Sequence, residues 1–277
     1  MSYRHKHIKT KIHKLTPKKS FYEKPYFWFA LIFVAVISSF IYFLIFFPKI
    51  QVNFIEISGN EKIESKNIEN TVATAIEKKF FNLGGFSLAS KSIFLVDLDD
   101  LNARLTSRFP EIETLSVNKK LPQTLVLEIK ERKPFAVFCK SGQGMPPEDC
   151  YFIDTAGVIF EALPAVPEGM AIVRQTVNES VFVGENAIAQ NIMSAISRIS
   201  DSLKNNFQID ISEALISTPV RLDIKTAESW QIYFNLDSDV NSQITKLNLI
   251  LKEEIPADSR KNLQYIDLRF RDKTYYK

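Results

Sequence analysis

The sequence predicts an α+β protein that one helix near the N-terminus anchors in a membrane. Three observations predict this architecture. Residues 26–47 form an apolar run without a charged side chain, residues 50–133 show strand and helix patterns in the order β-α-α-β-β, and residues 134–277 show the patterns of a mixed, mostly antiparallel β domain with helices. The low glycine content, 8 of 277 residues, and the many Ile, Leu, Val and Phe residues are typical of packed domains rather than of disorder.

The run at 26–47 is long enough to cross a membrane. As an α-helix it would span about 33 Å, compared with a hydrocarbon core of roughly 30 Å. A cleaved signal peptide is one alternative, but its apolar region is normally about 7 to 15 residues and is followed by small residues, whereas bulky residues at 46–48 end this run. A buried core helix is the other alternative, but Tyr26 and Trp28 resemble the aromatic belt of a membrane interface. We therefore expect a retained transmembrane helix.

Residues 1–25 form a basic tail that predicts the orientation of this helix. Eight Lys and Arg residues stand there against one acid, Glu23. Positively charged flanks stay on the cytoplasmic side, so we expect a cytoplasmic N-terminus and residues 48–277 on the outer face. The tail can also attract anionic lipid or nucleic acid. A topology signal needs no such partner, however, and we expect no nucleic-acid ligand.

Five residues bear on metal and disulfide chemistry. The three histidines, His5, His7 and His13, lie in the tail without companion Cys or carboxylate ligands, so we expect no metal site. Only two cysteines occur, Cys139 and Cys150, and an exported compartment permits a disulfide between them. Closing so short a loop would stabilise the fold by about 3 kcal/mol. Two free thiols are the alternative, and neither arrangement implies a cofactor.

The first region after the membrane run shows the β-α-α-β-β pattern. Apolar residues alternate with polar ones in the expected strands and return every three or four residues in the expected helices. Acidic residues at 97–100 are typical of a helix N-cap, and Pro110 ends the second helix. The expected elements are a strand at 51–58, a helix at 63–79, a loop at 82–92, a helix from about 97 to 109, and strands at 114–119 and 124–132.

The second region follows without a flexible linker. Strand patterns dominate it, and two amphipathic patterns predict helices at 186–203 and 240–252. We expect a hairpin at 151–160, strands at 171–175, 180–183, 207–211, 214–217, 220–225, 231–236 and 263–270, and a short final segment at 274–276.

Six motifs occur together outside the membrane run. They are SGN at 58–60, FPEI at 109–112, Val117 followed by KLPQTL at 120–125, ERKPFA at 131–136, FIDTAGVIF at 152–160 and YIDLRF at 265–270. With the anchor and the β-α-α-β-β order, they resemble the FtsQ/DivIB family of bitopic bacterial division proteins. The resemblance implies a POTRA domain at 50–133 and an FtsQ-type β domain at 134–277. The chain departs from the family pattern at Leu121, where an aromatic residue is often found, and at 140–149, which looks like an insertion.

The resemblance implies a non-enzymatic protein of the divisome at the septum of the cell membrane. It would recruit and position FtsB/FtsL-type coiled-coil partners and so regulate septal peptidoglycan synthesis. The lipid bilayer is the expected partner of residues 26–47. An alternative is a POTRA-bearing, membrane-anchored export or scaffold protein that binds extended polypeptides. An anchored hydrolase is a third class, but residues 48–277 contain no histidine and thus no histidine-dependent triad.

The resemblance places the partner site at the C-terminal strand and the segment after it. The candidate residues are Arg269, Phe270, Thr274, Tyr275 and Tyr276. Arg269 can pair with a partner carboxylate, and the aromatic side chains can bury contact area. Phe270 and one tyrosine can instead pack on the protein's own core, to which Ile266 and Leu268 belong in either case. Glu131 and Arg132 also have two interpretations, a partner surface or an ion pair that orients the two domains.

Overall fold

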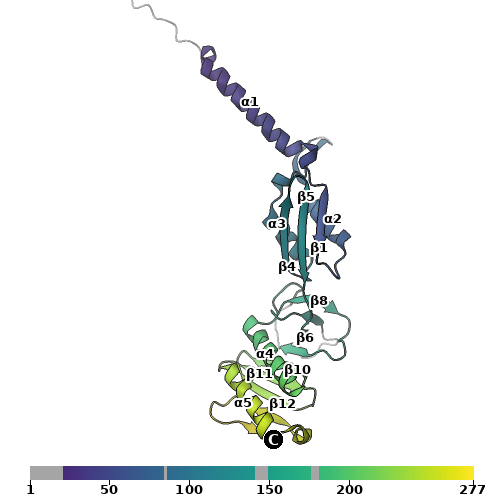
Figure 1. Ribbon diagram of the computed structural model, residues 1–277, viewed down its shortest axis with the longest axis vertical. Helices are drawn as coiled ribbons and strands as arrows, with labels where there is room; N and C mark the ends of the chain where they lie inside the picture. Colours follow the sequence, from purple (N-terminus) through teal and green to yellow (C-terminus); the bar gives the residue numbers. More distant parts are fainter. Residues whose placement is uncertain (1–20, 84–85, 141–148, 176–180) are drawn as a thin grey trace, which may run out of the picture.

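The computed structural model describes residues 21–83, 86–140, 149–175 and 181–277. The chain forms an elongated series of three parts: a long helix, a small unit with a three-stranded sheet, and a larger unit with a nine-stranded sheet (Figure 1). The predictions for residues 1–20, including those for the three histidines, lie outside the described residues.

The long helix α1 (Pro25–Phe46) matches the predicted membrane run. Pro25 begins it, as is common for the first helical position. The described residues contain one helix long and apolar enough to cross a membrane, and none of its side chains is buried by the rest of the chain. Short 3₁₀ turns, η1 (Phe21–Glu23) and η2 (Pro48–Ile50), flank α1.

The three-stranded sheet has the order β1-β5-β4. β1 (Phe54–Ser58) runs parallel to β5 (Thr124–Glu131), and β4 (Ile112–Lys120) runs antiparallel to β5. One face of β5 packs with helices α2 (Ser65–Ile76) and α3 (Leu98–Arg108) in a common hydrophobic core. The Asp97 carboxylate accepts hydrogen bonds from the first turn of α3, which confirms the predicted N-cap.

The prediction of a loop at 82–92 is wrong. β2 (Lys78–Leu83) and β3 (Phe86–Ser90) form an antiparallel hairpin there, and α2 ends at Ile76 rather than at the predicted residue 79. The sequence KKFFNL has aromatic residues that favour strands. A short 3₁₀ turn, η3 (Ile93–Leu95), follows the hairpin.

The nine-stranded sheet is mixed, as predicted, with the order β14-β13-β12-β11-β10-β9-β6-β7-β8. Its parallel neighbours are β6 with β9, β9 with β10, and β12 with β13, and the other pairs are antiparallel. The strands are β6 (Ala136–Lys140), β7 (Cys150–Ile153), β8 (Ile159–Leu163), β9 (Ile172–Gln175), β10 (Ile211–Thr218), β11 (Arg221–Thr226), β12 (Gln231–Asn235), β13 (Tyr265–Asp267) and β14 (Tyr275–Tyr276).

Helices α4 (Gln190–Phe207) and α5 (Val240–Glu253) pack on this sheet, and η4 (Ala257–Asn262) leads into β13. Their apolar side chains share one core with the sheet, which includes Trp230 and Phe234. This core is separate from that of the three-stranded unit. The division of the chain at residues 133 and 134 agrees with these two cores but stays a prediction.

Three predicted strands differ from the structure. Residue 207 ends α4, and the left-handed conformation of Gln208 separates it from β10, so no strand starts at 207. Residues 181–183 lead into a turn in which the backbone N–H of Glu185 donates to the carbonyl of Phe182, while Ser180 lies outside the described residues. The strand predicted at 263–270 is limited to β13, because the backbone N–H of Arg269 turns back to the Asp267 carboxylate.

Candidate functional site

β14 forms one outer edge of the nine-stranded sheet. It pairs only with β13, with Tyr276 opposite Ile266 and Tyr275 opposite Asp267. Within the described ranges, no strand pairs with the other side of β14. An outer strand presents backbone N–H and C=O groups with which another chain can pair. The predicted strand end and the predicted final segment thus meet at a sheet edge with an open side.

The exposed aromatic side chains at this edge come from the loop after β13 and from β14. Phe270, Tyr275 and Tyr276 are each about half exposed, and the rings of Phe270 and Tyr275 contact each other edge to face with centroids 5.3 Å apart. Ile266 and Leu268 are buried, as expected. Phe270 therefore packs against a neighbouring surface residue rather than in the core.

Arg269 is already engaged within its own chain. Its Nε and Nη2 donate to the two carboxylate oxygens of Asp267 at 2.9 and 2.6 Å. The guanidinium groups of Arg269 and Arg221 lie 5.4 and 5.3 Å from the ring centroid of Tyr233, and the guanidinium of Arg221 also pairs with Asp223. A partner carboxylate that binds Arg269, as predicted, would therefore have to share this guanidinium with Asp267.

Charge and burial shift the pKa values of this pair. Burial of Asp267 favours its neutral form, but the hydrogen bonds and positive charges of Arg269, together with Arg221, outweigh burial and hold the pKa of Asp267 below its ordinary value. The hydrogen bond to Asp267 raises the pKa of Arg269 above its ordinary value, although burial opposes the shift. Both groups therefore stay charged near neutral pH.

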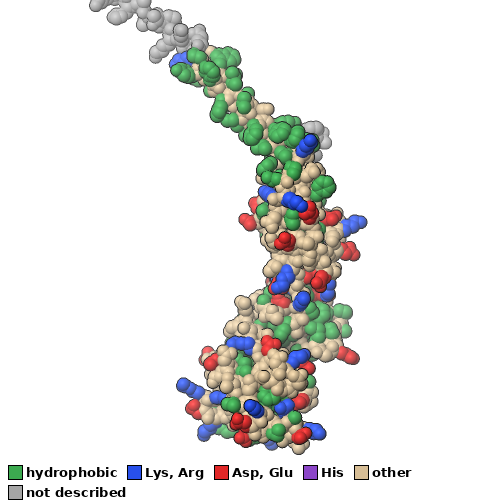
Figure 2. All heavy atoms as spheres, viewed as in Figure 1, with side chains coloured by type: hydrophobic (Ala, Val, Ile, Leu, Met, Phe, Trp, Pro, Cys, Tyr) green, Lys and Arg blue, Asp and Glu red, His purple; other side chains and the backbone are tan. Residues whose placement is uncertain are grey.

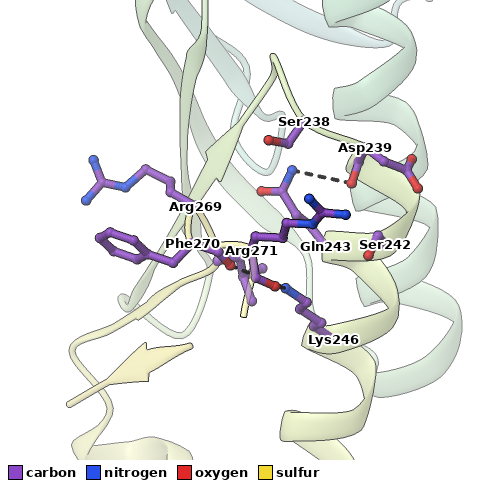
Figure 3. A pocket seen from close by; sticks show the side chains of 9 residues that line it. Ser238, Asp239, Ser242, Gln243, Lys246, Arg269, Phe270 and Arg271 are labelled. Carbon is purple, nitrogen blue, oxygen red and sulfur yellow. Dashed lines mark hydrogen bonds between the residues drawn. The ribbon is translucent and has the colours of Figure 1, made fainter. Parts of the chain in front are cut away.

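A hollow of about 460 Å³ lies between α5 and the loop after β13. Figure 3 shows Arg271 pointing toward α5 on one side of this loop, while Arg269 and Phe270 point away from α5. The Lys246 ammonium on α5 donates to the backbone carbonyls of Phe270 and Arg271. Lys246 thereby helps to fix the loop that presents the Phe270 side chain.

Sequence patterns did not indicate that Asp267, Tyr233 and Lys246 support this edge. The spacing of Asp267 and Arg269 was a usable signal, because residues two apart on an extended chain point to the same side. No comparable signal links Tyr233 or Lys246 to the edge, since both come from other elements of the sheet and helix layers. Thr274 lies in the loop before β14 and is half buried.

Arg132 and Glu131 lie at the junction of the two sheets and act differently from each other. The Arg132 guanidinium pairs with Asp154 in the turn between β7 and β8, and its Nε donates to the carbonyl of Pro110 at 3.0 Å. The Glu131 carboxylate instead accepts hydrogen bonds from the backbone N–H groups of residues 61–63. Arg132 thus makes an ion pair between the two units, whereas Glu131 holds a loop within the first unit.

The environment of Glu131 lowers its pKa. Burial alone would raise the pKa of Glu131, but the three backbone hydrogen bonds and the nearby charge of Lys62 outweigh this effect. The exposed Lys62 ammonium also pairs with Glu161 on β8 at 3.2 Å. A second, solvated ion pair therefore crosses the same junction.

In the structure, a disulfide joins Cys139 on β6 to Cys150 on β7. The two residues are register partners in the antiparallel pair β6 and β7. Residues 141–148 of the predicted insertion lie outside the described residues. Formation of this bond in the cell remains a prediction.

Comparison with known families and proteins agrees with this order of units. The family model described as "POTRA domain, FtsQ-type" matches residues 84–132, and the model described as "Cell division protein FtsQ/DivIB, C-terminal" matches residues 145–269. Together the two matched segments cover more than half of the chain.

Curated relatives carry corresponding names. The chain is 25% identical to the cell division protein DivIB of Clostridium tetani over 75% of this chain and 73% of the relative. It is 28% identical to FtsQ of Streptomyces bingchenggensis over 31% of this chain and 30% of the relative. For FtsQ of Streptomyces griseus the identity is 26%, over 46% of this chain and 52% of the relative. The matches thus span about a third and about half of the two Streptomyces proteins. With both domain types matched in the order that the fold shows, this chain belongs to the FtsQ/DivIB family of cell-division proteins.

Proposed function

We propose that this protein is a non-enzymatic assembly factor of the divisome whose C-terminal edge binds FtsB/FtsL-type coiled-coil membrane proteins. By positioning these partners it regulates septal peptidoglycan synthesis. The observation that supports the proposal best is the open side of β14, flanked by the exposed side chains of Phe270, Tyr275 and Tyr276. Family membership supports a role in division.

Binding by strand addition uses the groups present at this edge. A partner strand beside β14 would pair with its backbone, and the contact between Phe270 and Tyr275 offers an aromatic anchor next to that strand. Asp267 neutralises the charge of the Arg269 guanidinium and uses two of its five N–H donors, which leaves the other donors for a partner carboxylate. A partner segment that carries an apolar residue and a nearby carboxylate therefore fits this edge best.

Sequence and topology support the remaining parts of the proposal. Residues 48–277 contain no histidine, so they cannot form a histidine-dependent catalytic triad. In the part of the chain that the structure describes, no three His, Cys, Asp or Glu side chains form a metal-binding group. The basic tail favours a cytoplasmic N-terminus and thus supports POTRA and β domains on the outer face of the cell membrane. Family membership supports a location at the septum.

Affinity capture of the full-length protein tests the proposal. The variant Phe270→Asp places a charge in the aromatic pair, and Phe182→Asp makes the same change at an exposed phenylalanine between β9 and α4 in the sequence. Both variants should retain the near-ultraviolet circular dichroism of the wild type. Wild type and Phe182→Asp should then capture small coiled-coil membrane proteins, and Phe270→Asp should lose them.

Two outcomes would contradict the proposal. Equal capture by Phe270→Asp and the wild type would place the binding surface elsewhere. Capture of secreted polypeptides in place of coiled-coil proteins would favour the alternative of an export or scaffold protein.

A further inference from the structure

The end of α1 is bound to the POTRA domain through its backbone. The last carbonyl groups of a helix lack partners within the helix. Here the Leu44 carbonyl accepts a hydrogen bond from the Ser92 hydroxyl at 2.7 Å, and the Ile45 carbonyl accepts from the Gln51 amide at 2.7 Å and the Ser90 hydroxyl at 2.5 Å. Segments near residues 51 and 90–92 thus cap the membrane helix.

This cap determines the depth of the β2–β3 hairpin. As a helix of 22 residues, α1 is about 33 Å long, so its last turn lies at the boundary of the hydrocarbon core. Ser90, the last residue of β3, is within hydrogen-bond distance of that turn. Figure 1 shows the hairpin projecting sideways beside the end of α1. A bilayer placed around α1 therefore has Ser90 and the adjoining strand residues at the level of its interfacial layer.

Two exposed phenylalanines flank the helix end at this level. The Phe80 ring on β2 lies 6.0 Å from the ring of Phe46, the last residue of α1, and Phe94 lies in η3, which contacts α1. Phe80 is 48% exposed and Phe94 is 51% exposed, and neither belongs to a hydrophobic core. Figure 2 shows hydrophobic side chains on the surface where α1 meets the POTRA domain. The described chain leaves both rings half exposed, so lipid at this depth can contact them.

The charges around these rings favour phospholipid. Residues 46–52 and 77–96 contain four lysines, Lys49, Lys78, Lys79 and Lys91, against the single acid Glu77. Apolar rings that enter the acyl boundary, with lysines at the level of the phosphates, are typical of interfacial membrane segments.

We propose that the β2–β3 hairpin and η3 form a second membrane contact, which dips Phe80 and Phe94 into the leaflet where α1 ends. The occupant is the phospholipid of that leaflet, because the surface is continuous with the membrane helix itself. The contact prevents the POTRA domain from rotating freely at the end of its anchor. This inference uses only the membrane helix and does not depend on the partner proposed for β14.

Quenching by brominated phospholipids tests the contact in full-length protein reconstituted into vesicles. The background is Trp28→Phe, because Trp28 lies in the membrane helix, whereas Trp230 is buried in the β domain and remains in every sample. Phe80→Trp and Phe94→Trp report on the contact. Phe182→Trp is the matched control, since Phe182 is exposed and belongs to the nine-stranded unit.

The fluorescence emission that Phe80→Trp and Phe94→Trp add should lie to the blue of the emission that Phe182→Trp adds. Brominated lipid should quench it. The loss should be larger when the bromines lie near the headgroup than near the end of the acyl chain. The emission added by Phe182→Trp should not change. Emission from Phe80→Trp and Phe94→Trp that is unaffected by bromine would overturn the proposal, whether water or a second copy of the chain covers the rings.

Discussion

The Asp267 carboxylate accepts two hydrogen bonds from the guanidinium of Arg269, two residues further along the chain, and a third from the Arg269 backbone N–H. This arrangement turns the chain out of β13 and points it toward β14. Because Asp267 is 6% exposed, loss of the guanidinium would leave a buried carboxylate poorly satisfied. We predict that Arg269→Ala lowers the free energy of unfolding by about 2 kcal/mol, measured by urea unfolding with Trp230 fluorescence. Arg271→Ala, at an exposed position in the same loop, should change it little.

Acid should weaken the fold through Glu131 and Asp267. The folded-state pKa of each lies below its ordinary value, 4.5 for Glu131 and 3.8 for Asp267. Each group therefore contributes stability above its ordinary value, and this contribution is lost as the pH falls through the lowered folded pKa. Urea midpoints measured at decreasing pH should fall less steeply for Glu131→Gln and Asp267→Asn than for the wild type. Glu56→Gln, which removes one partner of an exposed ion pair, serves as the control, and parallel acid slopes in all variants would contradict this prediction.

Two glycines offer a matched test of a close backbone approach. Gly59 and Gly169 have φ angles of +81° and +79°, so alanine is strained at both positions by about 1–2 kcal/mol. A Cβ at residue 59 would also lie 2.0 Å from the carbonyl oxygen of Ile129, whereas nothing lies within 4 Å of a Cβ at residue 169. Gly59→Ala should therefore destabilise the protein clearly more than Gly169→Ala in thermal unfolding. Equal losses would show that the chain relieves the clash at no cost.

Two ion pairs connect the POTRA and β domains, and they differ in how deeply they are buried. The side chains of Arg132 and Asp154 are 16% and 7% exposed, whereas those of Lys62 and Glu161 are 62% and 39% exposed. Arg132→Met leaves a buried carboxylate and should cost about 3 kcal/mol. Lys62→Met breaks a solvated pair and should cost less than about 1 kcal/mol. Limited proteolysis near residue 133 should accordingly speed up for Arg132→Met alone.

The disulfide between Cys139 and Cys150 should stabilise the β domain. Replacing both residues by serine restores the conformational freedom of the short loop in the unfolded chain, and we expect a loss of about 2–3 kcal/mol. The same loss should follow when a reductant is added to the wild type, and the double variant should be insensitive to that reductant. A wild type that does not respond to reductant would indicate free thiols.

Local patterns were sufficient to predict most elements of this fold. The uncharged run, the acidic cap at Asp97 and the alternation in β5 each depend on neighbours in sequence, and the structure has all three elements. The β2–β3 hairpin was not predicted, because its glycine pair is typical of a loop. In addition, the hairpin contacts the end of α1, which lies more than 30 residues earlier in the sequence. Contacts of that kind leave no periodic signal.

The candidate edge was predictable only in part. Its position follows from the resemblance of the last strand to the family pattern, but the contacts that its side chains make do not. From the sequence we expect Arg269 to be available to a partner carboxylate. In the fold it pairs with Asp267 and lies over the ring of Tyr233, a residue of the neighbouring strand. Likewise, Lys246 reaches the loop after β13 from α5, 24 residues before Phe270, because the helix packs across the sheet end.

The orientation of the three-stranded sheet determines how far a binding partner must extend. β4 and β5 run along the long axis of the molecule, and β14 lies in the unit beyond them (Figure 1). The nine residues of β4 alone correspond to about 30 Å. A partner anchored in the same bilayer therefore needs at least roughly 20 residues of helix outside the membrane to reach β14, or about 9 residues of fully extended chain. A single-pass protein whose outer segment covers less than this distance in both conformations is too short to bind there, whatever its sequence.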